Sequence, residues 1–257
     1  MSKYFENFPI TKYSFGDNEE PVYFEKLTTY IDLFESIKEV LAFYTTVEVI
    51  DGERPDTLSY RLYGTTDYHW TFYFMNEKIR ESGWPLTVDR EYELIREYYP
   101  NWVITTESPI AQFFPAGQVI THNTGITSTV VKKYPDLGQL VISPASAPNQ
   151  SNLLLSTTQV TYLEGGVGGI LRQAEDIVSV KREYEAVHHY ENLSGEYVDI
   201  NPDEQGFEGG TDSTSGLTTI TWEERFKSKN EDLRQLTVLR SDVVAQVVGQ
   251  FNRALKK

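Results

Sequence analysis

The pattern of apolar residues changes twice along this 257-residue chain, and that change limits the possible folds more than any other feature. Before about residue 101 and after about residue 220, apolar residues recur every three or four positions, which is typical of amphipathic helices. In between, runs such as VITT, QVITH and STVVKKY are separated by Gly, Pro, Asn and Ser, which is typical of strands and turns. The sequence therefore predicts an α+β protein in which a small β-rich domain is inserted between two helical parts.

The N-terminal part is expected to combine helices with one strand. An arm and an amphipathic helix are predicted within 1–43, where FEKLTTYIDLFESIKEVLAFY carries apolar residues at helical spacing. The alternating segment YTTVEVID, 44–51, predicts a strand. Pro55 suits a first helical turn and Gly64 suits a helix end, so a short helix is expected over 55–63.

An aromatic segment follows and allows two interpretations. Trp70, Tyr73 and Phe74 share one face of a second short helix that would end at Asn76, but HWTFYFM also fits a strand. A further helix is expected from a cap at Thr87, with Pro100 beyond its end. The segment 44–100 is thus predicted to form one compact module.

The β-rich part, 101–193, contains a weak internal repeat. QVITHNTGITSTVV from Gln118 and QVTYLEGGVGGILR from Gln159 align without gaps and match Gly125 to Gly166. Two related hairpins that close a small barrel would explain this repeat.

The C-terminal part returns to helical spacing after an acidic, Gly-rich loop over 194–219. Thr221 and Glu224 form a capping-box pattern that predicts a helix start, and RQLTVLR, 234–240, predicts a short strand. A last helix is expected to open at Ser241, so that 220–257 forms a helix-strand-helix docking segment. Its apolar stripe needs a surface to lie against and consists of Val244, Val247, Val248, Phe251 and Leu255.

Charge and composition exclude several classes of function. The net charge of −15 opposes binding to nucleic acid or anionic membranes, and no Lys/Arg cluster offsets it. The chain has no cysteine, which excludes disulfides and thiolate metal sites. No stretch of eighteen apolar residues and no secretory leader pattern is present, so a soluble protein is expected. The 17 tyrosines suit surfaces that another protein covers.

No motif in the chain predicts an enzyme, a cofactor or a metal. In EYEAVHHYE, 183–191, Glu185 and His189 could meet on a helical turn, but adjacent histidines point to different faces and a third ligand is missing. DINPDEQG, 199–206, begins like a calcium loop and then lacks its Gly and its final Glu. GGVGGI, 165–170, lacks the Lys-Ser/Thr of a phosphate loop, and tight β-turns explain it better. No Gly-X-Ser-X-Gly occurs.

The segment YTTVEVIDGERPDTLSYRLYGTTDYHWTFYFMNE resembles a LysM module, a small βααβ unit known for binding peptidoglycan and chitin. The match includes Gly52, Leu58, Tyr63, Gly64 and Asn76. The closing Gly-Gln-X-Leu strand of that family does not follow, and GWPLTVDREYE stands in its place.

A narrower resemblance extends to both ends of the chain. Gly-Glu-Arg-Pro-Asp at 52–56, His69-Trp70 and Gly83-Trp84-Pro85 are similar to the baseplate wedge subunits of T-even-type contractile-tailed phages, often called wedge protein 53. Asn230-Glu-Asp-Leu-Arg-Gln-Leu-Thr-Val-Leu and the helix after it resemble the C-terminal signature of the same family. Together the two blocks cover roughly the first hundred and the last thirty-five residues.

This resemblance implies a non-enzymatic virion protein, assembled in the host cytoplasm, that clamps adjacent wedges of the tail baseplate. Its implied partners are other wedge proteins, sheath-proximal tail proteins and neighbouring wedges. A LysM-type peptidoglycan-binding protein is the alternative. The residues expected to contact partners are Arg54, Tyr68, His69, Trp84, Val244, Val248, Phe251 and Leu255.

Overall fold

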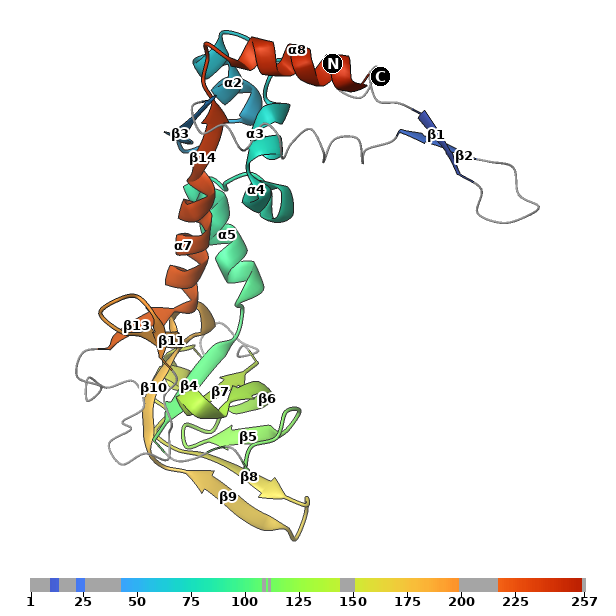
Figure 1. Cartoon of the computed structure of the whole chain (residues 1–257). Coiled ribbons are helices and arrows are strands. Elements are labelled where there is room, and N and C mark those ends of the chain that lie inside the picture. Colours follow the sequence, from blue (N-terminus) through green and yellow to red (C-terminus); the bar gives the residue numbers. More distant parts are fainter. Residues whose placement is uncertain are drawn as a thin grey trace. The chain divides into compact units, whose positions relative to one another are not determined.

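The computed structural model of the chain, shown in Figure 1, describes residues 10–13, 22–25, 43–107, 110, 112–143, 151–198 and 217–255. It confirms the α+β class. The amphipathic stretch 27–41, most of the acidic loop and the calcium-loop-like 199–206 lie outside the described residues.

The chain divides into two compact units, and the division differs from the expected domain limits. The first unit comprises Met1–Val88 and Lys229–Lys257, and the second comprises Asp89–Ser228. The predicted module 44–100 and the predicted segment 220–257 therefore contribute to one unit, because the chain passes into the second unit within one helix and returns within another.

The first unit contains two two-stranded antiparallel sheets, β1–β2 and β3–β14, and short helices. Its elements are β1 (Ile10–Tyr13), β2 (Val22–Glu25), β3 (Tyr44–Glu48), α2 (Pro55–Tyr63), α3 (Trp70–Met75), α4 (Glu77–Ser82), β14 (Gln235–Leu239) and α8 (Val244–Leu255).

Local sequence signals explain where helix α2 begins and ends. Pro55 occupies the first turn, where a missing N–H costs no hydrogen bond. Gly64 ends the helix with φ of 72°, in the left-handed region, and its N–H donates to the Tyr60 carbonyl. The ambiguous segment HWTFYFM is helical as α3, because Phe72 and Phe74 are buried in two different apolar clusters and a helix can serve both.

Strand β14 completes this unit from more than 140 residues downstream of α4. It pairs with β3 so that Leu236 faces Val47 and Thr237 faces Thr46. GWPLTVDREYE does not supply a closing strand, since it forms a loop and the start of helix α5 (Val88–Tyr98). Leu236 and Leu239 of β14 belong to separate apolar clusters, so this one strand contributes to both parts of the core.

The second unit is built around a seven-stranded antiparallel sheet in the order β10-β4-β7-β6-β5-β8-β9, with a three-stranded sheet β12-β11-β13. Its elements are α5, β4 (Trp102–Thr106), β5 (Val119–His122), β6 (Thr127–Tyr134), β7 (Gln139–Ile142), α6 (Ser151–Leu155), β8 (Val160–Glu164), β9 (Ile170–Ala174), β10 (Ile177–Arg182), β11 (Val187–Glu191), β12 (Tyr197–Val198), β13 (Thr218–Thr221) and the part of α7 (Trp222–Arg234) up to Ser228.

The seven-stranded sheet curls around one apolar cluster without closing into a barrel. Every strand contributes a buried residue to that cluster. Strands β9 and β10 lie at opposite ends of the strand order, yet only residues 175 and 176 separate them in sequence. A link this short spans about 10 Å, so the end of β9 must lie close to the start of β10. No ladder joins β9 to β10 among the described residues, and the expected closed barrel is therefore not found.

The two expected hairpins are present, but their gapless alignment does not match their burial. Val119 is exposed on β5, whereas the aligned Val160 is buried on β8. Side chains alternate between the two faces of a strand, so a shift of one residue between the hairpins reverses the buried face. The run LLL, 153–155, lies in helix α6, although it falls within the part of the chain predicted to be β-rich.

The predicted capping box at the start of α7 is present. The Thr221 N–H donates to Glu224 Oε2 at 2.8 Å, and the Glu224 N–H donates to Thr221 Oγ1 at 3.2 Å. No helix in the described part of the chain combines the length and apolar character needed to cross a bilayer.

Candidate functional site

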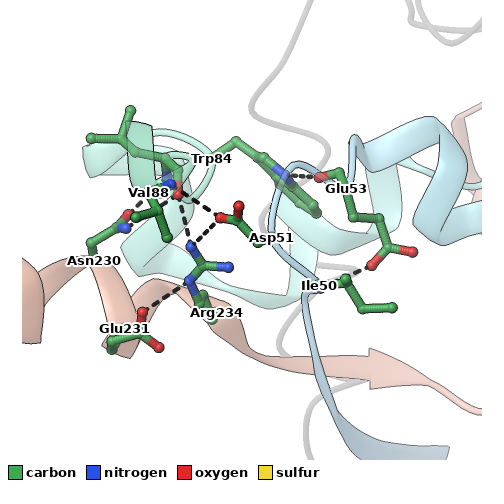
Figure 2. Close-up of polar contacts among 9 residues, drawn as sticks. Ile50, Asp51, Glu53, Trp84, Val88, Asn230, Glu231 and Arg234 are labelled. Carbon is green, nitrogen blue, oxygen red and sulfur yellow. Dashed lines mark hydrogen bonds and ion pairs between the residues drawn. The ribbon is translucent and has the colours of Figure 1, made fainter. Parts of the chain in front are cut away.

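Segments that are distant in sequence meet around Arg234 in the first unit, as Figure 2 shows. Arg234, at the end of α7, is buried, and its Nη2 donates to Asp51 Oδ1 at 2.8 Å and to the Leu86 carbonyl at 3.0 Å. Its Nε lies 3.1 Å from Glu231 Oε1. One guanidinium thus joins the loop after β3, the loop after α4 and the helix that precedes β14. We call these contacts, together with those of Asn230 and Glu53 described below, the Arg234 network.

Asn230 makes a second connection between the same segments. The Leu86 N–H donates to Asn230 Oδ1 at 2.8 Å, and Asn230 Nδ2 donates to the Leu86 carbonyl at 3.2 Å. The side-chain amide therefore satisfies both main-chain groups of Leu86, as a neighbouring strand would. Because Asn230 is buried, water cannot easily replace these bonds.

Glu53 connects the network to helix α2. Its carboxylate accepts two hydrogen bonds of 2.7 Å from Arg61, in the bidentate geometry that favours Arg–carboxylate pairs. Its main-chain carbonyl accepts a bond of 2.7 Å from Trp84 Nε1. The hydrogen bonding of Arg61 to the Glu53 carboxylate raises the pKa of Arg61. The hydrogen bond from Arg234 lowers the pKa of Asp51, which also accepts from the Val88 N–H at 3.1 Å.

The Arg234 network borders a shallow, solvent-open pocket of about 610 Å³. Three carboxylates and two guanidiniums line it, and Asp51, Glu231, Arg61 and Arg234 already interact within the chain. Across the described ranges, no group of three or more His, Asp or Glu residues is arranged to hold a metal ion. These contacts fix the loops that carry Asp51 and Leu86 against helix α7.

The predicted contact residues near the module surface differ in exposure. Arg54 is exposed and forms an ion pair of 3.2 Å with Asp56. Tyr68 and His69 are partly buried, and the Tyr68 ring meets Tyr63 edge to face at 5.9 Å. Trp84 is also partly buried, because its indole packs against other aromatic rings and donates to Glu53.

The apolar stripe of the last helix is covered by the chain itself. Val244 and Phe251 are buried, and Val248 packs against the same cluster. The Phe251 ring lies 5.0 Å from the Trp70 ring and 5.8 Å from the Phe74 ring. Val244 and Phe251 are therefore core positions of the first unit, and Val248 is partly buried beside them. The side chain of Leu255, the last predicted residue, lies outside the described ones.

The adjacent histidines of the second unit do not point to opposite faces. A bulge in β11 between Val187 and His189 lets His188 Nδ1 approach His189 Nδ1 to 2.8 Å. His189 Nε2 lies 3.0 Å from Glu191 Oε1. His189 lies in a strand, so it does not meet Glu185 on a helical turn, the arrangement considered and set aside from the sequence.

A buried histidine on β5 is a further polar centre of the second unit. His122 Nδ1 lies 3.1 Å from Thr157 Oγ1, and its Nε2 lies 3.0 Å from Ser128 Oγ. Burial lowers the pKa of His122 to about 4, so the ring is neutral at pH 7 and can donate through one nitrogen and accept through the other.

Neither Asn230 nor Arg234 is among the predicted contact residues. Their spacing of four places both on one face of α7, and this spacing is the sequence signal that could have identified them. Their contacts with Asp51 and Leu86 span more than 140 residues, a separation that local pattern cannot predict.

A scan against protein-family models finds no match for this chain, and a search of curated proteins also finds none.

Proposed function

We propose that this protein is a non-enzymatic structural subunit of a contractile phage tail baseplate and that it clamps adjacent wedges through protein–protein contacts. Its partners in this proposal are other wedge proteins and sheath-proximal tail proteins. It would act in the virion after assembly in the host cytoplasm.

One observation carries the proposal: the separated sequence blocks that resemble the wedge family meet in one folded unit. The block 52–56 and the block 83–85 are joined by the Trp84–Glu53 hydrogen bond. The block 230–239 contributes Asn230 and Arg234 to the Arg234 network and then continues as strand β14. Spatial convergence supports a common structural origin for these blocks, since an accidental resemblance would not need to fall in one unit.

The order of elements β3-α2-α3 followed by pairing with β14 supports a LysM-like arrangement whose closing strand is displaced by an insertion. In this arrangement the aromatic side chains pack in the apolar core of the first unit. Phe72 and Phe74 are buried, and Trp70 packs against Phe251. A module that packs its aromatic rings inward fits a scaffold role better than a sugar-binding role, which needs exposed aromatic faces.

The direct test is genetic. A phage that lacks this chain is expected to accumulate separate wedges and no closed baseplates, as measured by sedimentation and negative-stain electron microscopy. Closed baseplates of normal abundance without the chain would overturn the proposal.

A charge-reversal variant tests which part of the surface contacts the other wedge proteins. Arg54→Glu is expected to reduce the yield of closed baseplates, because Arg54 is exposed on the unit that carries the family resemblance. Arg90→Glu is the matched control, since Arg90 is also exposed and forms a similar local pair with Glu93 at 2.8 Å. Equal yields from the two variants would remove Arg54 from the contact surface.

Peptidoglycan binding is the second candidate function, and the LysM-like arrangement of β3, α2, α3 and β14 is the observation that favours it. Retention of the whole protein on purified peptidoglycan would support it. The exposed Tyr60 on α2 is the residue to replace, because Trp70→Ala would also disturb the core. No retention of the wild-type protein would exclude this function.

A further inference from the structure

The β8–β9 hairpin of the second unit carries an unusual amount of exposed apolar surface. Strand β9 is the last strand of the seven-stranded sheet and pairs only with β8 among the described strands (Figure 1). The exposed apolar residues of the hairpin and their relative exposures are Leu163 at 47%, Val167 at 105%, Ile170 at 61% and Leu171 at 57%. An edge strand with such side chains is a template for pairing with another strand.

The tip of the hairpin is specified by glycine. Gly165, Gly166 and Gly168 have φ of 83°, 78° and 87°, which other residues rarely adopt. A Cβ on Gly169 would lie 1.8 Å from the Glu164 carbonyl oxygen. These glycines hold the fully exposed Val167 at the apex of a defined turn.

The two faces of the hairpin have different surroundings. Tyr162 and Ala174 point into the core, so the opposite face of β8 and β9 points to solvent. Leu163 and Leu171 are direct cross-strand partners and lie on that solvent face. Leu163 and Leu171 therefore form a short row on the solvent face that ends at the free edge of β9.

We propose that the free edge of β9 pairs antiparallel with β9 of a second copy of this protein, with the two-fold axis at Leu171. In this register the row Leu163–Leu171 continues into the same row of the second copy, and four leucines become one covered strip. Arg172 then faces Ile170 of the second copy, where its aliphatic stem can pack. This inference does not depend on the proposed baseplate function.

The leucine row is complementary to itself, which favours a second copy as the occupant, and charge favours this register. An axis at Arg172 would place two guanidiniums opposite each other, which is unfavourable, whereas an axis at Leu171 opposes no like charges. Arg172 is already neutralised by Glu164 in its own hairpin, at 2.7 Å. The strands β8 and β9 are therefore locally neutral on a chain of net charge −15, so two copies can pair at this edge without bringing like charges of these strands together.

The test is the oligomeric state of the whole protein, measured by sedimentation velocity and equilibrium up to ~500 µM, because a contact made by one strand pair is small and weak. The wild-type protein is expected to form a reversible dimer that strengthens between 20 and 500 mM salt, since salt screens the net repulsion. Leu171→Lys is expected to weaken the dimer at least tenfold.

Leu193→Lys is the matched control, because Leu193 is 91% exposed in the turn between β11 and β12 and lies outside the hairpin. If Leu171→Lys unfolds at a lower temperature than the wild-type protein, Leu163→Lys is used in its place. A wild-type protein that stays monomeric over the whole range, or a dimer that Leu171→Lys and Leu163→Lys leave intact, overturns the proposal. So does a strand from another protein that binds β9 while the chain remains monomeric.

Discussion

Asn230 illustrates how one side chain can take the place of a strand. It supplies an acceptor and a donor to Leu86, whose main-chain groups have no neighbouring strand in this loop. Asn230→Ala is expected to lower the free energy of unfolding by about 1–3 kcal/mol, because two part-buried hydrogen bonds are lost and the Leu86 N–H is left without its acceptor.

Urea denaturation measures this change, and Lys229→Ala on the same helix is the control because Lys229 is exposed. A loss below ~0.5 kcal/mol for Asn230→Ala would show that water replaces the amide.

His122 predicts a defined pH dependence of stability. Its folded-state pKa of about 4 lies below the ordinary value of 6.5, so the unfolded chain binds the proton more readily. The contribution to stability is complete above pH 6.5 and is lost as the pH falls toward 4. The loss is on the order of 3 kcal/mol for this one group.

The measurement compares the unfolding free energies of the wild-type protein and His122→Gln between pH 7.5 and 4.5. The difference should change in favour of the variant as the pH falls, because glutamine does not titrate. Parallel curves would mean that the ring is protonated as easily in the folded protein as in the unfolded chain.

At the scale of elements, helix α8 is an internal part of the first unit. Phe251→Ala is expected to cost about 3–5 kcal/mol, because Phe251 is buried against Trp70 and Phe74. Thermal unfolding followed by tryptophan fluorescence measures this change. The neighbouring Arg253→Ala, at an exposed position, should behave like the wild-type protein.

Truncation after Arg240 should therefore unfold the first unit, since it uncovers a complete apolar cluster. A truncated chain with an intact first unit would contradict the described packing of α8.

Elements with strong local signals could be predicted, whereas long-range pairing could not. Pro55, Gly64 and the Thr221–Glu224 capping box mark helix ends in the sequence itself. The strand 235–239 was also predictable from its β-branched pattern, but its pairing with β3 was not, because nothing in either strand encodes the intervening distance. For the same reason the sequence predicts the apolar stripe on α8 but does not predict that this stripe packs against α3.

At the scale of the whole molecule, the second unit is an insertion into the first. The ends of the insertion are close together in the first unit, since the Leu86 N–H donates to Asn230 Oδ1 at 2.8 Å. Replacing 89–228 by a short Gly/Ser linker is therefore expected to leave the first unit folded.

Two-dimensional NMR checks this outcome, with retention of the Thr237–Asn76 contact as the marker of β14 pairing. A collapsed spectrum for the excised protein would show that the first unit needs the second for stability.

The late position of strand β14 also affects how the protein is made. A ribosome must add the 140 residues from Asp89 to Ser228 before it reaches the strand that completes the first unit. At ordinary rates of synthesis this takes roughly 7–30 s. The second unit is contiguous and can fold in that interval. During the same time Leu58, Phe72 and Ile79 lack strand β14, which covers them in the folded protein. Newly made chains are therefore expected to need chaperone protection at their N-terminal rather than their C-terminal half.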